Sequence, residues 1–340
     1  MDPITQGAIG ASLPQALTKK TAKHFSILII GWLSGMAPDL DVLIRSQEDP
    51  LLFLKYHRQF THSLIFIPFG ALFCSLLFYP FFKKSFQFKE IYLYSFLGYL
   101  THGLIDSCTS YGTQLFWPFS NMRVAWNNIS IIDPLFTFPI LGLIFWGAFK
   151  NKALFARVAV IYALLYLSLG LFQNYRARMA ALDLAKKRGH TIKSVSAKLS
   201  IANLFLWKTI YKYKGKFYID AIHNLGPTKI YEGNSILELN LERDFPQIKK
   251  GTKQWNDIQR FSWFSMGYVA KDPQKENFIM DVRYSMIPNS SRPLWGIKLN
   301  PSNQDNHVKY LTERNMNPGL VKKFKAMLLK HDLLESKFGN

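Results

Sequence analysis

Cysteine is nearly absent from this chain, since the 340 residues include only two. So few cysteines exclude a disulfide-stapled scaffold and a cysteine-rich zinc module. Acidic residues are also scarce, with 22 Asp and Glu against 42 Lys and Arg, which gives a net charge of +20. Disorder is excluded as well, because 49% of the residues are hydrophobic and 15% are aromatic. Such a basic chain invites a nucleic-acid interpretation, which depends on where the charge lies.

Long stretches of the first half lack charge. Residues 1–172 hold 13 Lys and Arg against 8 Asp and Glu, whereas the remainder holds 29 against 14. Residues 63–82 have no charge at all, and a soluble core helix would show a polar face there. Several apolar runs reach the roughly 17–25 residues that cross a bilayer. The runs are 27–44, 63–82, 91–105, 131–149 and 154–172. With a short Gly- and Ala-rich helix over residues 3–17, they predict an integral membrane bundle of five to six segments.

The orientation follows from the short connections. The start has no basic region of the kind that opens a cleavable signal peptide. Every second connection is basic, and the positive-inside rule places these in the cytoplasm. The connections 45–62 and 107–130 and the tail after Phe172 are then expected outside. We therefore predict a multi-pass protein of the bacterial inner membrane. The basic connections carry Lys19, Lys20 and Lys23; Lys83, Lys84 and Lys89; and Lys150, Lys152 and Arg157.

Acidic and histidine side chains gather at the predicted outer face. The segments run in alternating directions, and four of them end or begin there with an ionisable residue. Such a residue in a membrane segment costs about 2.5–3.5 kcal/mol on insertion scales, so it usually has a partner or a function. The residues are Asp39 and Asp41 after the second segment, His57 and His62 before the third, His102 and Asp106 at the end of the fourth, and Asp133 before the fifth.

Imidazole and carboxylate together form a site for zinc, manganese or iron. His102 and Asp106 stand four residues apart, on one helical face. Taken alone, this pair could be a structural hydrogen bond, Asp41 an interfacial cap and Arg58 a headgroup anchor. Their convergence on one face favours a metal site instead. We expect the ligands to be Asp39, His57, His62, His102 and Asp106. Asp41 or Asp133 would act as general base or orient a ligating histidine, and Arg58 would clamp an anionic group.

Five motifs resemble the YdjM-type family, whose members are described as membrane-bound metal-dependent hydrolases. They are DPITQG from Asp2, PDLD from Pro38, HRQFTHS from His57, THGLID from Thr101 and YGTQLFWPF from Tyr111. The similarity covers about residues 1–172. The family is thought to be distantly related to zinc phospholipases C and fungal single-strand nucleases. That relation implies an α-helical site that binds zinc and cleaves phosphoesters. Many members have a histidine where this chain has Gln6, so one ligand position differs.

The tail changes in character. Residues 173–200 predict a basic connecting helix that meets lipid phosphates, and residues 201–340 predict a soluble α+β domain with a small antiparallel sheet. Strands are expected at 204–213 and 217–222 around a turn at Lys214-Gly215, and an amphipathic helix after Pro318. No P-loop, Rossmann or helix-turn-helix signature is found. Strands with a buried aromatic and a solvated basic face are favoured over base stacking, so nucleic acid is not an expected partner. Asp281 and Arg283 either form an ion pair or line the site.

The leading hypothesis is a membrane metallohydrolase that acts on a phosphoester or lipid-linked substrate, with zinc as the first choice of ion and manganese or iron as alternatives. Its partners would be membrane lipids and a small-molecule or lipid substrate. The alternative is a non-catalytic membrane scaffold or regulatory protein in which the polar site is structural. A transporter is disfavoured because the acidic residues gather at one face instead of the midplane.

Overall fold

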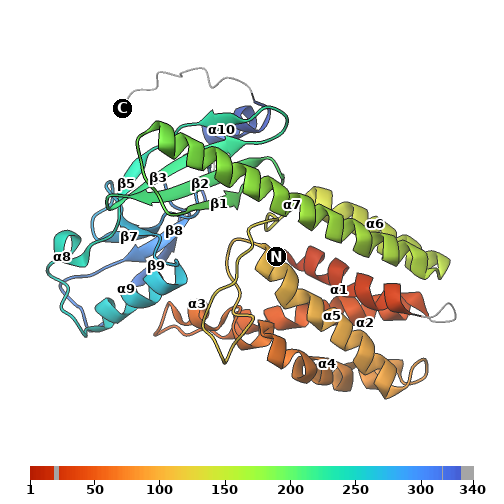
Figure 1. The fold of residues 1–340 in the computed structure, drawn as a ribbon. Helices are drawn as coiled ribbons and strands as arrows, with labels where there is room; N and C mark the ends of the chain where they lie inside the picture. Colours follow the sequence, from red (N-terminus) through yellow and green to blue (C-terminus); the bar gives the residue numbers. More distant parts are fainter. Residues whose placement is uncertain (19–22, 316, 331–340) are drawn as a thin grey trace. The chain divides into compact units, whose positions relative to one another are not determined.

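A computed structural model describes residues 1–18, 23–315 and 317–330 of the chain (Figure 1). Lys19 and Lys20, part of the first basic connection, lie outside these residues. The chain forms two compact units. We call Met1–Ile44, Tyr56–Phe172 and Ile201–Leu204 the helical unit, and Arg45–Lys55, Gln173–Ser200 and Phe205–Asn340 the C-terminal unit. The long helix α7 (Ala153–Lys187) runs from the first into the second without a break.

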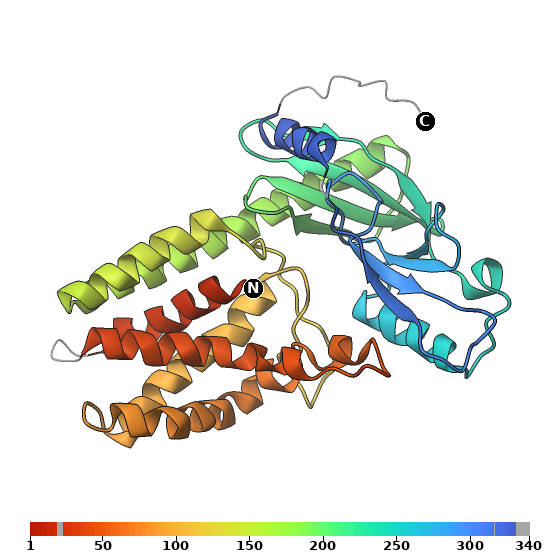
Figure 2. The same cartoon turned by 180° about the vertical axis from the view of Figure 1, so that it is seen from behind.

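The helical unit contains α1 (Pro3–Leu17), α2 (His24–Met36), α4 (Ile67–Phe82), α5 (Phe88–Cys108), α6 (Pro134–Lys150) and the first half of α7, as Figures 1 and 2 show. Short 3₁₀ turns follow α2 at Ala37–Leu43 and precede α4 at Phe60–His62 and Leu64–Phe66. Among the described residues, three helical stretches are long and apolar enough to cross a membrane, namely His24–Leu43, Leu64–Phe82 and Ala153–Lys187. The helix α6 is apolar but shorter. The expected helical, membrane-type first half is thus confirmed.

Glycines allow the helices of this unit to pack at backbone distance. A Cβ atom added to Gly10 of α1 would lie 2.6 Å from the carbonyl oxygen of Gly31 in α2. A Cβ atom on Gly98 of α5 would also lie 2.6 Å from that oxygen and 3.0 Å from the Gly31 Cα atom. Small residues permit such contact inside a membrane, where helices associate through van der Waals packing. Helices α1, α2 and α5 therefore meet at Gly31, and this contact sets the position of α5.

The C-terminal unit contains two antiparallel sheets within its described residues. The first has β1 (Val195–Leu199), β2 (Leu206–Tyr213), β3 (Lys216–His223) and β4 (Lys229–Tyr231) in that order, with β5 (Ser235–Leu237) also on β3. The second has β6 (Val269–Lys271), β7 (Phe278–Asp281), β8 (Trp295–Lys298) and β9 (Lys309–Thr312). The turn at Lys214-Gly215 joins β2 to β3 as predicted, with Tyr213 opposite Lys216. Besides the second half of α7, the helices of this unit are α3 (Leu52–Tyr56), α8 (Leu241–Asp244), α9 (Lys253–Phe264) and α10 (Pro318–Leu328). The last residue of α3, Tyr56, is counted with the helical unit.

Both faces of the first sheet are covered. Ala181 and Ala185 of α7 pack on Tyr211 and Ile222 on one face. On the other face, Ile210 and its neighbours pack on Phe278 and Met280 of the second sheet. Asp281 and Arg283 form a fully buried ion pair of 2.7 Å, and the Trp295 indole N–H donates to Asp281 at 3.2 Å. Of the two alternatives for this pair, the structure has the ion pair.

The first sheet also buries two lysines, although a solvated basic face was predicted for its strands. Lys198 and Lys208 are cross-strand partners, and each is 4% exposed. The Lys208 ammonium donates to the Ser285 hydroxyl and the Ser290 carbonyl, both at 2.7 Å. Burial lowers the pKa of Lys208 from 10.5 to about 7, with Lys198 adding to the decrease and Asp281 opposing it. The folded unit therefore prefers a neutral Lys208 above pH 7.

The first prediction concerns the contact at Gly31. Gly98→Ala places a methyl group against the α2 backbone and should destabilise the helical unit by about 1–3 kcal/mol. Gly142→Ala in α6 is the control, because nothing lies within 4 Å of its added Cβ atom. It should leave the melting temperature in detergent unchanged or slightly higher, since alanine favours a helix. Equal melting temperatures for the two variants would contradict the close packing.

The second prediction is a pH dependence. Between pH 7 and 10 the unfolded chain, with lysines near their ordinary pKa, binds more protons than the folded unit, so its stability should rise with pH. Below pH 7 both states are protonated and the dependence ends. This rise is measured by urea unfolding at different pH values. A hydrogen-exchange pulse at one fixed pH then reports the folded fraction of peptides from β2.

Lys208→Met should remove about half of the rise, because Lys198 still titrates. Lys212→Met, on the same strand but half exposed in its side chain, should leave it intact. An unchanged slope in Lys208→Met would contradict a neutral buried lysine.

Candidate metal centre

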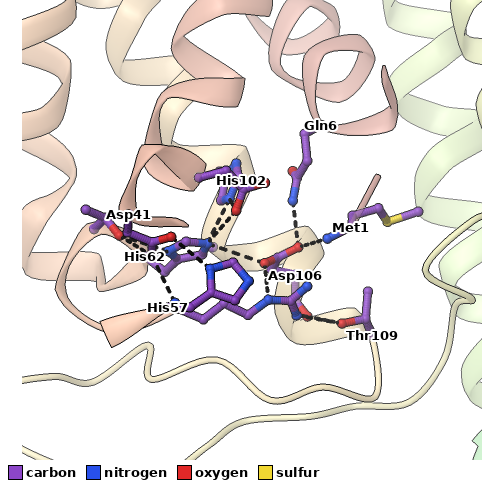
Figure 3. A network of polar contacts seen from close by, with 12 residues as sticks. Met1, Gln6, Asp41, His57, His62, His102, Asp106 and Thr109 are labelled. Atoms are coloured by element: carbon purple, nitrogen blue, oxygen red, sulfur yellow. Dashed lines mark hydrogen bonds and ion pairs between the residues drawn. The ribbon is translucent and has the colours of Figure 1, made fainter. Parts of the chain in front are cut away.

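Three elements of the helical unit bring the histidine and aspartate side chains together (Figure 3). Ala37 keeps right-handed helical angles although Pro38 follows it, and the chain continues from α2 directly into the 3₁₀ turn that carries Asp39 and Asp41. His62 ends the 3₁₀ turn before α4. His102 and Asp106 lie one turn apart near the end of α5. The side chains of His62, His102 and Asp106 are fully buried and that of Asp39 is 26% exposed, so the cluster has one solvent-facing side.

The donor atoms of Asp39, His62, His102 and Asp106 all lie within 4.8 Å of one another, so this group could hold a metal ion. The His62 and His102 Nε2 atoms are 2.9 Å apart. Each is 3.4 Å from Asp39 Oδ1, and His62 Nε2 is 3.4 Å from Asp106 Oδ2. A tetrahedral zinc site with bonds near 2.0–2.1 Å has ligand–ligand edges of about 3.3 Å. The donor atoms present therefore fit an ion with tetrahedral coordination.

Hydrogen bonds fix how each histidine faces the cluster. His102 Nδ1 lies 2.6 Å from the Gly35 carbonyl, to which it must donate, so its Nε2 lone pair points at the other ligands. His62 Nδ1 lies 3.2 Å from Asp41 Oδ2 and 3.0 Å from the Thr61 hydroxyl. Ligating histidines commonly donate their other N–H to a carbonyl or carboxylate, which fixes the tautomer. Asp41 therefore has the geometry of a residue that orients His62, and its role in the site stays a prediction.

The Asp106 carboxylate is surrounded by several cationic and hydrogen-bonding groups (Figure 3). Arg58 Nε lies 2.8 Å from its Oδ2 atom, and the Gln6 amide donates to Oδ1 at 2.6 Å. The Met1 amino group also contacts Oδ1. Gln6, at the position that differs from many family members, therefore holds Asp106 through its N–H₂ group. Its contribution here is a hydrogen bond to a ligand.

His57 stands beside the four-donor group. Its Nδ1 atom lies 2.8 Å from Asp41 Oδ1, and its side chain is 19% exposed. Asp39, Asp41 and His57 form a second set of donors that could hold an ion. The Asp41 carboxylate also accepts from the Arg58 backbone N–H at 2.9 Å, which holds Arg58 at a left-handed φ of 65°. Strained backbone of this kind persists where the surroundings fix it, often at functional sites.

Charge balance explains why a cation suits this cluster. Burial lowers the pKa of His62, but the carboxylates of Asp106, Asp39 and Asp41 outweigh it and raise the pKa to about 10. The surrounding carboxylates thus favour a positive charge at His62. A divalent ion would supply that positive charge instead, and its binding would release the proton.

Asp133 is the one predicted site residue that the structure keeps apart from the cluster. It caps α6 through the Phe136 N–H and accepts from the Tyr166 hydroxyl at 2.8 Å. A further group, Asp49, Asp257 and His307 of the C-terminal unit, was not expected, because its members lie far apart in sequence. The Arg260 guanidinium already bridges Asp49 and Asp257 at 2.9–3.1 Å. That group is balanced by a cation of the chain itself.

Comparisons with known proteins agree with the motifs. The sequence profile of the YdjM inner membrane protein family matches residues 1–177, which confirms the expected resemblance. A relative from Bacillus subtilis (strain 168), named "Uncharacterized protein YfhP", is 27% identical over 146 residues. The match covers 43% of this chain and 44% of that relative, so the chain spans less than half of its length. No solved structure matches. The distant relation to zinc phospholipases C stays a prediction.

The third prediction tests the ligands. His102→Ala removes a buried donor, so purified protein should lose its metal as measured by plasma mass spectrometry. Asp41→Asn keeps the shape of the group that orients His62 but not its charge, and it should weaken metal affinity about 10–100-fold in chelator competition. Asp133→Asn is the control and should keep the metal, because Asp133 lies outside the cluster. Metal loss in Asp133→Asn alone would refute this ligand set.

Proposed function

The chain belongs to the YdjM inner membrane protein family, and we propose that it is a membrane-bound metal-dependent hydrolase. The observation that carries the proposal is the buried group of Asp39, His62, His102 and Asp106, whose donor atoms converge on one point. Ionisable side chains that gather at the ends of apolar membrane helices usually bind a ligand or take part in a reaction. Zinc is the first candidate for the ion because the group combines two imidazoles with two carboxylates.

The proposed topology has five to six membrane segments, and the sixth is the short helix α1. In addition to the three long apolar stretches, α5 has 21 residues and packs on α2 and α4. The lysines between α4 and α5 lie at the ends of these helices opposite His62 and His102. The positive-inside rule then supports a site on the extracytoplasmic face. The C-terminal unit would lie on the same side.

In the proposed mechanism, the ion would lower the pKa of a bound water to about 7 and stabilise charge that develops on the scissile group. The chain's own residues set the geometry. The Gly35 carbonyl and the Asp41 carboxylate keep the His102 and His62 lone pairs aimed at one point. Arg58 and Gln6 hold Asp106, so this ligand cannot turn away. The apolar walls from α2, α4 and α5 exclude bulk water and strengthen each charge interaction.

His57 and Asp41 form the acid–base dyad of this mechanism. Asp41 holds His57 Nδ1, which leaves Nε2 of the partly exposed ring to accept a proton from water or to donate one to a leaving group. The same pair could instead join Asp39 in holding a second ion. The two roles differ in the number of ions bound per chain. In the second role the wild type binds two ions, and the His57→Gln variant loses one of them.

Phosphoesters and lipid-linked esters are the proposed substrates. The site lies at the end of membrane helices, and its exposed side is formed by Asp39 and His57, so a substrate held in the outer leaflet can reach it. Hydrophobic side chains such as Leu40 and Leu43 are exposed beside it. The rival is a scaffold or regulatory protein that uses the same ion structurally, and it predicts bound metal without turnover.

The fourth prediction is catalytic. Wild-type protein in detergent or liposomes should hydrolyse at least one of a phosphodiester, a phosphomonoester and a carboxylic ester, lose this activity to a chelator and regain it with zinc or manganese. His57→Gln should lower kcat by about 10²–10⁴-fold, the usual size of a general acid–base contribution. The exposed Asp183→Asn is the matched control. Bound metal with no turnover on any substrate would favour the scaffold.

A further inference from the structure

The connection between α5 and α6 folds back on itself beside the metal centre. Thr113 and Val124 pair in antiparallel fashion, with N–H···O distances of 2.9 and 2.8 Å. Gly112 has a φ of +92°, and a Cβ atom there would lie 3.0 Å from Arg123 Cβ and 3.2 Å from Arg123 Nε. Only glycine therefore lets Arg123 lie along this turn. The result is a small hairpin that brings Arg123 next to Tyr111.

Two guanidinium groups lie against the same aromatic ring. The Arg58 guanidinium carbon is 4.7 Å from the centre of the Tyr111 ring, and that of Arg123 is 5.5 Å from it. The His57 ring stands 5.7 Å from Tyr111, roughly edge-on. Arg58 also contacts Asp106, so the group formed by Tyr111 and the two arginines lies directly beside a proposed metal ligand.

Both arginines are built into place. They are 5% and 6% exposed, which is rare for a guanidinium. Arg58 donates to the Thr109 hydroxyl at 2.9 Å, and Arg123 donates to the Gly112 carbonyl at 2.8 Å. The Gln114 N–H donates to the Arg58 carbonyl at 3.0 Å and so supports its left-handed backbone. Tyr111 is only partly buried, so the group that this ring forms with the two arginines has one accessible edge.

Gln114 adds an independent observation. Its side chain is fully buried, yet neither amide atom has a hydrogen-bond partner within the part of the chain that is described. A buried amide of this kind costs about 1–3 kcal/mol unless something binds it. It lies on the same hairpin, one backbone hydrogen bond from Arg58.

We propose that Arg58, Tyr111 and Arg123 form the subsite that binds the phosphate group of the substrate. This inference rests on the proposed function and deepens it, because it selects a phosphoester over an uncharged ester. Planar guanidinium groups match the oxygens of phosphate and bind them through charge-assisted hydrogen bonds. Two buried guanidinium groups beside one ring raise the local positive potential, which a phosphate would lower. Arg58, between Asp106 and Tyr111, places that phosphate next to the proposed ion.

The test measures binding of inorganic phosphate to metal-loaded wild-type protein by titration calorimetry, with metal content determined on the same samples. Arg123→Gln removes one charge and Tyr111→Leu removes the ring. Arg123→Gln should weaken phosphate binding about ten- to a hundredfold, the effect of a lost charge-assisted hydrogen bond, and metal content should be unchanged. Tyr111→Leu should also weaken phosphate binding without loss of metal, because both guanidinium groups lose the ring that they lie against. Arg123→Lys keeps the charge and should fall between wild type and Arg123→Gln. The exposed Arg178→Gln should bind phosphate as the wild type does.

The outcomes separate this inference from the proposed function. Unchanged phosphate affinity in both Arg123→Gln and Tyr111→Leu, or no phosphate binding by metal-loaded wild type, overturns the subsite and leaves the metallohydrolase standing. A wild type that binds no metal overturns the metallohydrolase, and a loss of phosphate binding in Arg123→Gln would then still support the subsite. If Arg123→Gln fails to fold, Arg123→Lys and Tyr111→Leu decide the question.

Discussion

Compensation of the buried Asp106 charge is the constraint on which the helical unit depends. A carboxylate without water is tolerated only where cations and donors surround it, because desolvation otherwise costs several kcal/mol. Arg58, Gln6 and His62 surround Asp106; Gln6 comes from α1, and Arg58 and His62 come from the connection that precedes α4. Arg58 in turn requires a left-handed backbone, which the Asp41 carboxylate and the Gln114 N–H hold in place. The polar network thus ties α1, α5 and both connections on this face into one arrangement.

Helix packing determines whether this network can form. His102 reaches the Gly35 carbonyl only because α5 approaches α2 at backbone distance, and Gly31 and Gly98 permit that approach. A larger residue at either glycine would move the His102 Nε2 atom away from His62, although neither glycine touches a proposed ligand. Small residues in the membrane therefore act on the chemistry through distance. The same logic explains why the site lies where helices end, since the 3₁₀ turns after α2 and before α4 free Asp39, Asp41 and His62 from helical spacing.

Local sequence patterns were sufficient to predict those parts of the structure that depend on backbone geometry over a few residues. The spacing of His102 and Asp106 predicts one helical face, and Lys214-Gly215 predicts the turn of a hairpin; both follow from backbone periodicity. Alternating segments also predicted that Asp39, His62 and His102 share a level. Asp133 shares that level but points to Tyr166, because its own helix needs a cap. Arg123 could not be foreseen from spacing, since it reaches Tyr111 through a hairpin whose pairing depends on Gly112. Lys208 was assigned to a solvated face, but the second sheet covers that face. Lys198 lies in the segment 173–200 predicted as a connecting helix, but that helix ends at Lys187 and the chain continues into β1.

The buried lysines change what the net charge of +20 means. Part of the positive charge after Phe172 is internal or paired: Lys208 is hydrogen-bonded inside the first sheet, Arg283 is paired with Asp281, and Arg188 is paired with Asp220 and Glu232. Charge available to an anionic surface must come from exposed side chains, such as Lys322, Lys323 and Lys325 on α10. In the helical unit, Arg58 and Arg123 are buried beside the candidate metal centre, so neither is available to a membrane surface. Burial therefore divides a basic composition into charges that are satisfied inside the fold and charges that remain exposed to a partner.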